Sequence, residues 1–374
     1  MGVFCTIVPP HILDRLARSD DPELSGTARH TLEHDARQRT RRGLHAAIGP
    51  TAAPRAGTGP AEPAKGADQP QRTIYDAQHK DDLPGHEIRA EGAKASTDAS
   101  VNRAYDGLGA TFATYLTAYA RHSIDGRGLP LNASVHYLKG YNNAFWNGEQ
   151  MVFGDGDGRI FLDFTLPVDV IGHELTHGVT QFTANLDYQG QSGALNESVS
   201  DVFGSLIKQF TLQQTAEQAD WLIGAGLLAP GIHGVALRSM KAPGTAYDDP
   251  HLGKDPQPGT MDGYVSGSDD NGGVHINSGI PNHAFYLTAA ALGGHAWKQA
   301  GQIWYDTLTG GSLASNADFA GFAAATLAAA KARYGEGAQY QAVRAAWSTV
   351  GVTTAAAGSA ELPRQQPGEQ TQEA

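Results

Sequence analysis

The sequence predicts an α+β protein with a strand-rich N-terminal lobe, a mainly helical C-terminal lobe and an active-site cleft between them. Three observations predict this class. The chain has 374 residues, enough for two domains and a sizeable core. Its strand-like segments cluster early, at 72–77, 133–138 and 145–158. From about Pro167 onward the apolar residues follow a helical spacing instead.

The elements before Pro167 follow from local patterns. Residues 1–48 favour a small helical unit, because Ile12, Leu13 and Leu16 fall on one face. Residues 49–71 carry five prolines and almost no large apolar side chain, which is typical of a flexible linker. The core opens with the strand-like RTIYDA, and a helix is expected from about 97 to 121. The short strands follow, and the GDGDG stretch at 154–158 is interpreted as a turn.

The second half of the core is predicted to be helical. Val170, Ile171, Leu175 and Val179 are spaced by three and four, as on one face of a helix. Further helices are expected at 193–210, 281–293, 300–309 and 316–333, and residues 354–374 are polar and predicted to form a disordered tail. The core therefore divides into lobes at 72–180 and 181–353.

The overall charge excludes some partners. Lys and Arg number 27 against 39 Asp and Glu, a net charge of −12, which argues against a nucleic acid or an anionic membrane as the main partner. No apolar run reaches the length of about 18 residues that spans a membrane. The N-terminus lacks the pattern of a standard secretory signal, so export would need another route. Cys5 is the single cysteine, so no intrachain disulfide can form.

The stretch HELTH at 173–177 is the main candidate for chemistry. His173 and His177 are four apart, which places both imidazoles on one helix face, where they can bind one metal ion. Glu174 lies beside them and can take a proton from a metal-bound water without occupying a coordination position. The alternative is a helix with two structurally satisfied histidines and a surface glutamate.

A second segment, GALNESVSD at 193–201, favours the catalytic interpretation. A catalytic zinc needs a third protein ligand, and Glu197 lies twenty residues beyond His177 in a predicted helix. Asp201 is one turn further on the same face, where a carboxylate could fix the tautomer of a ligating histidine. By itself this segment would be read as a solvated helix face.

Together these residues resemble the thermolysin-like family of zinc metallopeptidases. The resemblance covers nearly all of residues 72–351, and it rests on several separated motifs: NNAFWNG (142–148), MVFGDGDG (151–158), HELTHGVT (173–180), SGALNESVSDVFG (192–204), LRSM (237–240) and DNGGVHINSG (270–279). The implied activity is that of a zinc-dependent endopeptidase acting on proteins or peptides.

The resemblance also implies a role for each matching residue. The zinc ligands would be His173, His177 and Glu197, with Glu174 as general base and with Asp201 and Asn196 supporting the histidines. His275 would stabilise the oxyanion, oriented by Asp270 and assisted by Tyr188. The substrate-binding residues would be Asn143, the backbone at Ala144, Arg238 and the apolar pocket positions Phe161, Phe164, Val170, Ile223, Leu227 and Leu237. Such a pocket predicts cleavage on the amino side of bulky apolar residues.

The chain departs from the family pattern at its calcium positions. Asp169 and Asp220 match the paired calcium site, but Lys208, Leu222 and Ala225 stand at other ligand positions, and Val235 replaces an acid elsewhere. A lysine in a carboxylate cluster repels a cation, so the paired Ca²⁺ site is predicted to be absent or weak, with Lys208 supplying ion pairs instead.

The N-terminal region resembles the short propeptide of the protealysin subgroup, through VPPHILDRLA at 8–17. The implied role of residues 1–48 is inhibition, with Pro9-Pro10 near the active site until the chain is cut in the 49–71 linker or at the dibasic Arg41-Arg42. Cys5 could bind the open coordination position of the zinc as a latency switch. The simpler interpretation is a small apolar side chain in the propeptide core.

Two other functions are considered. A silent binding protein with a structural zinc would not need Glu174, His275, Tyr188 and Asp270. Another zincin, such as an aminopeptidase, does not fit the segments at 142–148 and 270–279, which match an endopeptidase cleft. We therefore expect a monomeric enzyme made as a zymogen and secreted, with a cytoplasmic location as the alternative.

Overall fold

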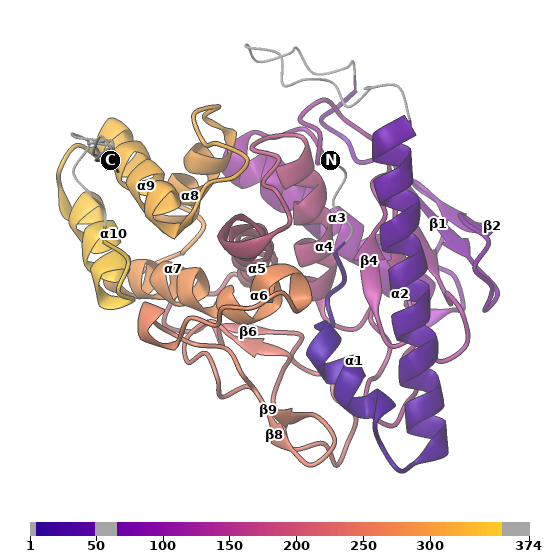
Figure 1. Ribbon diagram of the computed structural model, residues 1–374. Helices are drawn as coiled ribbons and strands as arrows, with labels where there is room; N and C mark the ends of the chain where they lie inside the picture. Colours follow the sequence, from indigo (N-terminus) through magenta and orange to yellow (C-terminus); the bar gives the residue numbers. More distant parts are fainter. Residues whose placement is uncertain (1–4, 49–65, 354–374) are drawn as a thin grey trace, which may run out of the picture.

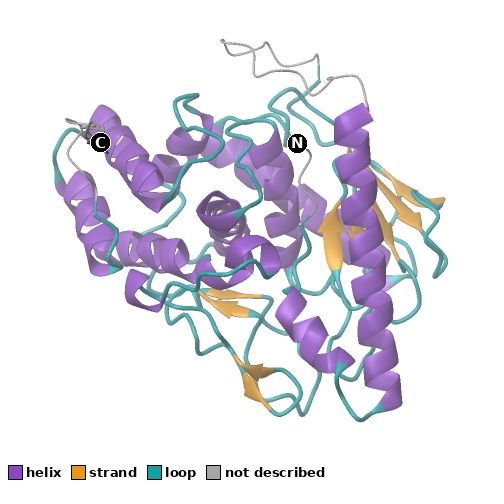
Figure 2. Ribbon diagram, in the orientation of Figure 1, coloured by secondary structure: helices purple, strands orange, loops and turns teal. Residues whose placement is uncertain are grey.

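A computed structural model describes residues 5–48 and 66–353 (Figure 1). The predicted tail from 354 and most of the predicted linker lie outside the described residues. Figure 2 shows the strands of the main sheet gathered in one half of the molecule and helices filling the other. This confirms the predicted α+β class with two lobes.

The elements fall into two groups along the chain. In the first part they are α1 (Pro10–Ala17), α2 (Pro22–Ile48), β1 (Arg72–Asp76), β2 (His86–Ala90), α3 (Ala99–Tyr119), β3 (Leu131–Val135), β4 (Ala144–Trp146) and β5 (Met151–Phe153). In the second part they are α4 (Val168–Gln181), α5 (Gly190–Leu212), β6 (Leu222–Ile223), β7 (Arg238–Ser239), β8 (Asp248–Asp249), β9 (Gly253–Lys254), the 3₁₀ turn η1 (Met261–Gly263), α6 (Asp270–Asn277), α7 (Gly279–Leu292), α8 (Ala300–Thr309), α9 (Phe319–Tyr334) and α10 (Ala338–Thr349).

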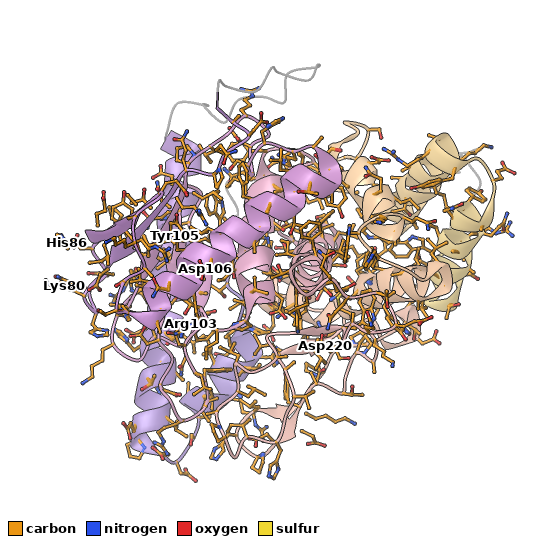
Figure 3. The ribbon with its side chains drawn as sticks, turned by 180° about the vertical axis from the view of Figure 1, so that it is seen from behind. Lys80, His86, Arg103, Tyr105, Asp106 and Asp220 are labelled. Carbon is orange, nitrogen blue, oxygen red and sulfur yellow. The ribbon has the colours of Figure 1, made fainter. Side chains whose placement is uncertain are left out.

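The main sheet has the order β2-β1-β3-β5-β4 in the described part of the chain. β1, β3 and β5 run parallel, and the edge strands β2 and β4 are antiparallel to their neighbours. In the view from behind, α3 crosses this sheet with Arg103, Tyr105 and Asp106 along its length (Figure 3). Arg103 pairs with Asp163 at 2.7 Å, which ties α3 to the loop before α4.

Two predicted strand boundaries were wrong. The strand expected at 133–138 ends at Val135, because His136 and Leu138 have φ of 55° and 53° and leave the extended region. The single run expected at 145–158 is the hairpin β4–β5. Asn147 Oδ1 accepts hydrogen bonds from two backbone N–H groups in its turn. The GDGDG stretch is a turn, as predicted, organised by Asp157 Oδ1.

The helices that the sequence predicted in the second lobe are present, and α8 has the expected bounds. Elements that were not predicted include the edge strand β2, the short strands β6 to β9, the helix α6 and the terminal helix α10. β2 is mostly exposed and has no apolar alternation, so its pattern carries little signal. No described helix is long and apolar enough to cross a membrane.

The N-terminal segment packs against the rest of the chain, with α1 and α2 lying beside the strand-rich half (Figure 1). As predicted, Ile12, Leu13 and Leu16 form the buried face of α1. The helix α2 is longer than the small unit that the sequence suggested. Its start is capped by Asp21, whose Oδ1 accepts from the N–H groups of Glu23 and Leu24. Asp21 also pairs with Arg159 of the core at 2.7 Å.

Candidate active site

The site forms where α4 and α5 cross closely. A side chain on Gly172 would meet Ile207 Cδ1 at 2.7 Å. One on Gly204 would meet the backbone oxygen of Asp169 at 2.5 Å and the nitrogen of His173 at 3.1 Å. Only glycine at both positions lets the two helices approach this closely. The close approach brings the HELTH face of α4 against the acidic face of α5.

Three side chains expected to hold a metal converge at this crossing. His173 Nε2 and His177 Nε2 lie 3.0 Å apart. Each is 3.6 Å from an oxygen of Glu197. All three side chains are buried. The structure therefore brings together His173, His177 and Glu197 on one side of a common point.

The outer nitrogens of both histidines are fixed by hydrogen bonds. His173 Nδ1 lies 2.8 Å from Asp201 Oδ1, and His177 Nδ1 lies 2.9 Å from Asn196 Oδ1. Asp201 also accepts two bonds from Arg238. Burial would raise the pKa of the Asp201 carboxyl, but Arg238 and His173 hold it well below its usual range. These bonds orient the imidazoles, with Nδ1 as donor and Nε2 turned inward.

This arrangement fits a divalent cation. With both Nδ1 protons donated outward, the Nε2 lone pairs point at one place and repel each other unless a cation lies between them. Glu197 Oε2 is buried without a hydrogen-bond partner in the described part of the chain. Burial lowers the pKa of His177 to about 3, which keeps that imidazole neutral and able to bind a metal. Two imidazoles and one carboxylate are a donor set that suits catalytic zinc.

Glu174 lies beside these ligands. Its Oε2 accepts from the backbone N–H of Trp146 at 3.0 Å, which links α4 to β4. Its Oε1 has no hydrogen-bond partner among residues 5–48 and 66–353. Burial first, and then the charge of Glu197, raise the pKa of the Glu174 carboxyl well above its usual range. A carboxylate with a raised pKa is suited to accept and return a proton.

His275 faces the ligands from α6. The backbone bends at 270–273, where φ is positive for four successive residues, and this turns Asp270 back toward His275. Asp270 Oδ1 lies 2.6 Å from His275 Nδ1. Burial would lower the pKa of His275, but Asp270 and Glu197 raise it to about 9. Tyr188 completes this side, since its hydroxyl donates to Glu197 and lies 3.2 Å from His275 Nε2.

The first described residues run through this site, with a bend at Ile7 and Val8. Thr6 O lies 3.1 Å from His275 Nε2. Ile7 N donates to Ala144 O at 3.2 Å, and Ile7 O accepts from Arg238 at 3.0 Å. Val8 N donates to Asn143 Oδ1 at 2.9 Å. The main chain of residues 6–8 is thus held by the residues expected to bind substrate.

The expected pocket residues are all buried. These residues are Phe161, Phe164, Val170, Ile223, Leu227 and Leu237, and they belong to the large hydrophobic core that also contains Ile7. Ile7 itself is fully buried.

Lys208 lies between the two acids of the expected calcium position. Its Nζ is 3.1 Å from Asp169 and 2.8 Å from Asp220, which is labelled in Figure 3. Burial would lower the pKa of Lys208, but the charges of Asp169 and Asp220 raise it. The ammonium group thus occupies the position between these carboxylates, as the sequence predicted.

Some contacts of the site were missed by the sequence interpretation. Asn282 donates to Asp201 at 2.8 Å, and Ser200 Oγ lies 3.0 Å from His177 Nδ1. In α2, Asp35 accepts from Asn143 at 3.0 Å and from the Tyr141 hydroxyl. Ser200 is close to Glu197 in sequence and could have been considered. Asp35 and Asn282 lie far from their partners along the chain and carry no local signal.

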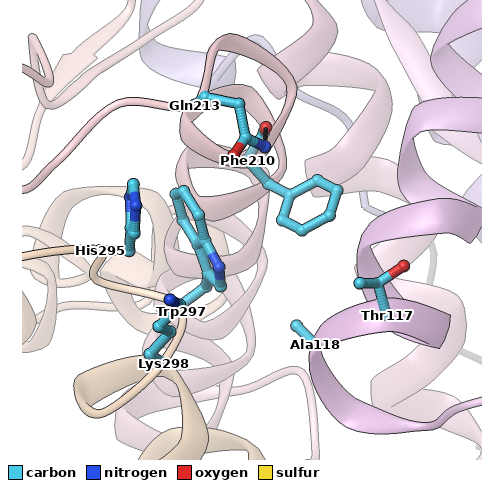
Figure 4. Close-up of a pocket in the computed structure, with 7 residues that line it drawn as sticks. All are labelled: Thr117, Ala118, Phe210, Gln213, His295, Trp297 and Lys298. Atoms are coloured by element: carbon cyan, nitrogen blue, oxygen red, sulfur yellow. Dashed lines mark hydrogen bonds between the residues drawn. The ribbon is translucent and has the colours of Figure 1, made fainter.

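A separate pocket of about 420 Å³ lies away from this site (Figure 4). Its walls come from α3, α5 and the segment before α8, with the rings of His295 and Trp297 stacked at 4.3 Å. None of the residues predicted to act in catalysis lines it, so it does not change the assignment of the site.

Comparisons with known proteins agree with this geometry. Residues 64–181 match the family model described as thermolysin metallopeptidase, catalytic domain. Residues 184–352 match the model described as thermolysin metallopeptidase, alpha-helical domain. The two matches meet between α4 and α5, where the candidate ligands converge.

Individual relatives cover nearly the whole chain. An extracellular metalloprotease of Pectobacterium carotovorum subsp. carotovorum is 51% identical over 349 residues, which is 93% of this chain and 96% of that protein. A thermolysin of Alicyclobacillus acidocaldarius is 40% identical over 289 residues, 74% of this chain and 50% of the relative. The solved precursor of protealysin, a metalloproteinase from Serratia proteamaculans, is 50% identical, covers 93% of this chain and 100% of its own, and has a TM-score of 0.83. The chain belongs to the thermolysin family of metallopeptidases and is a metalloendopeptidase.

Proposed function

We propose that this metalloendopeptidase binds zinc through His173, His177 and Glu197 and cleaves peptide bonds on the amino side of bulky apolar residues. We propose further that it is made as a zymogen, with residues 1–48 as inhibitory propeptide. The observation that carries the proposal is the segment 6–8, whose main chain is bound by Ala144, Arg238 and His275. A peptide substrate would use the same donors and acceptors.

The chemistry follows from where these side chains point. Zinc, when bound, supplies a Lewis acid that activates water and polarises a carbonyl oxygen. Glu174 takes the proton of the attacking water and passes it to the leaving amine. His275 and Tyr188 donate to the oxygen on which negative charge develops. Asp270 keeps His275 in the orientation that lets Nε2 donate.

The specificity proposal rests on Ile7. Its backbone lies in the position of the residue that follows the cut, and its side chain is fully buried in the apolar cluster. A bulky apolar side chain buried there gains roughly 1.5–3 kcal/mol, whereas a charged one would lose its hydration. A peptide library showing a preference for charged residues after the cut would contradict this assignment.

We propose that the paired calcium site is absent. Lys208 bonded to Asp169 and Asp220 provides the positive charge at that position. The thermal unfolding midpoint of the full chain is then expected to be the same in a calcium chelator and in millimolar calcium. A large increase on adding calcium would contradict the proposal.

The setting of the enzyme follows from its relatives. Proteins at 51% and 53% identity are named extracellular, from Pectobacterium carotovorum and Serratia marcescens. We propose that this chain is likewise secreted, acts as a monomer and has its catalytic lobes at 72–180 and 181–353, after a linker at 49–71.

The decisive experiment compares the full chain with Glu174→Gln after limited proteolysis of both. Glutamine keeps an oxygen for the Trp146 N–H but cannot take a proton, so casein cleavage is expected to fall by about 10²–10⁴-fold. Bound zinc should stay unchanged by elemental analysis. Removing zinc with a chelator should abolish wild-type activity, and adding it back should restore it. Equal activity of both proteins would refute the mechanism.

A further inference from the structure

Cys5 lies next to the candidate metal ligands. Its Sγ, a ring nitrogen of His177 and a carboxylate oxygen of Glu197 all lie within 4.8 Å of one another, and all three residues are buried. His173 is not part of this group. Two ligands of one tetrahedral zinc are about 3.5 Å apart, so a bound ion would have to draw the sulfur closer to the ligands.

A second observation points to a ligand at the same place. Glu197 is almost fully buried, and its Oε2 has no hydrogen-bond partner among the residues described. Glu174 Oε1 is likewise buried and has no hydrogen-bond partner among the residues described. Since an unpartnered buried carboxylate oxygen is costly, this cluster is arranged for a cation and the groups around it. The thiol of Cys5 belongs to that cluster by position.

The backbone after Cys5 is in the register of a substrate. The oxygen of Thr6 faces His275 Nε2, which is the donor proposed for the reacting carbonyl. Ile7, one residue later, is held through its N–H by Ala144 and through its oxygen by Arg238. The Thr6–Ile7 peptide bond therefore stands where the enzyme would cut, with Ile7 as the apolar residue after the cut.

From this geometry we propose that Cys5 Sγ is the fourth ligand of the zinc in the full chain, and that this ligation keeps the Thr6–Ile7 bond from being cut. The inference rests on the proposed zinc function. A thiolate takes the position that the attacking water needs, because a catalytic zinc with three protein ligands has one open position. Binding releases the thiol proton. The propeptide then occupies the position of a substrate, while the thiolate of Cys5 excludes the water that would attack it.

Removing the sulfur should allow self-cleavage. In Cys5→Ala, water adds across the Thr6–Ile7 bond: its hydroxyl goes to the carbonyl carbon of Thr6, the C–N bond breaks, and the proton goes to the nitrogen of Ile7. Intact-mass spectrometry of the full chain should show loss of residues 1–6. The double variant Cys5→Ala with Glu174→Gln should stay whole, since it lacks the general base. Cys5→Ala staying whole under the same conditions would overturn the protective role.

Metal ligation is read separately by spectroscopy. In the full chain loaded with cobalt(II), a sulfur ligand gives a charge-transfer absorption in the near ultraviolet. That band should be present in the wild type, lost in Cys5→Ser and kept in Ser25→Ala, a control that also changes one small buried propeptide residue. Identical spectra for wild type and Cys5→Ser would overturn the ligation.

The two proposals fail in different ways. If none of these proteins binds cobalt or zinc stoichiometrically, the proposed metal centre itself is wrong. If all bind metal and the wild type has no sulfur band, the centre stands and the Cys5 inference fails. Alkylation gives the same distinction, because ligation by zinc predicts that Cys5 reacts with iodoacetamide only after the metal is removed.

Discussion

At the scale of single residues, Asp201 connects the proposed metal ligands to the residues proposed to bind substrate. It is fully buried and bonds to His173, Arg238 and Asn282. One carboxylate thus orients a ligand and at the same time neutralises the arginine that binds the oxygen of Ile7. Because all of these groups are buried, each bond is made in a low dielectric and the loss of one partner is costly.

We therefore expect Asp201→Asn to weaken both the metal site and the fold. An amide has one acceptor oxygen, and its NH₂ group would face the donors of Arg238. Metal affinity is expected to fall by about 10–100-fold, and the free energy of unfolding by about 3–5 kcal/mol. Competition with a chromogenic chelator and urea unfolding measure the two effects. Unchanged metal affinity would contradict the supporting role of Asp201.

His136 gives a pH-dependent prediction at the same scale. It lies 2.8 Å from both Asp155 and Asp98, the N-cap of α3. The hydrogen bond to Asp155, opposed by burial, raises the pKa of His136 from 6.5 to about 9. Because the pKa of His136 is raised in the folded state, the stability that its positive charge contributes is complete below about pH 6.5 and is lost as the pH rises through about 9.

We expect His136→Gln to lower the free energy of unfolding by about 1–2 kcal/mol at pH 6 and by much less at pH 10. Denaturant unfolding of both proteins at the two pH values measures the difference. A destabilisation of equal size at both pH values would show that the positive charge on His136 is not involved.

At the scale of elements, the crossing of α4 and α5 brings the proposed metal ligands together. The two helices approach closely because Gly172 and Gly204 present no side chains at the contact. α4 contributes both histidines and α5 contributes Glu197, so the distance between the helices sets the distance between the ligands. The helix α4, which carries HELTH, therefore cannot form this site without α5.

We expect Gly204→Ala to force the helices apart. Its new methyl group would meet Asp169 O at 2.5 Å, so we predict a loss of about 1–3 kcal/mol in unfolding free energy and weaker zinc binding. Gly26→Ala in α2 is the matched control. Since a methyl group at Gly26 would have no atom within 4 Å, that change should be neutral or stabilising by up to about 1 kcal/mol. Similar behaviour of the two variants would disprove the close-packing argument.

At the scale of the whole molecule, the N-terminal segment joins both lobes. α2 contacts the strand-rich lobe through Asp35 and His34, which bond to Tyr141 and Tyr137. Ile7 reaches Arg238 of the second lobe. Under the proposal that this segment is an inhibitory propeptide, latency would depend on contacts distant from the metal site.

We expect Asp35→Ala to weaken latency without changing the catalytic residues. It removes the buried acceptor of Asn143, which in turn holds Val8, at a cost of about 2–5 kcal/mol to the bound propeptide. The uncleaved full chain should then hydrolyse a fluorogenic peptide at least about tenfold faster than the wild type. Glu33→Ala, an exposed residue of the same helix, should leave the chain latent, and latency in both variants would contradict the prediction.

The sequence by itself determined the parts that local spacing and residue chemistry encode. Histidines four apart on α4, the acidic face of α5 and the helices of the second lobe follow from patterns within one element. The ion pairs of Lys208 with nearby acids could also be predicted, once the resemblance had marked the position. The exposed strand β2 was missed because its segment shows no apolar alternation. The buried Val343, Ala346 and Trp347 of α10 do have the three-and-four spacing of a helix, so that helix could have been predicted.

Only the tertiary structure decided which distant residues meet. Arg238 and Ile7 are 231 residues apart, and His275 and Thr6 are 269 apart. No periodicity extends over such separations, because these contacts depend on how whole elements pack. The resemblance suggested that Pro9-Pro10 would lie near the active site. It is the packing that places Ile7 beside Ala144 and Arg238 and brings the sulfur of Cys5 beside His177 and Glu197.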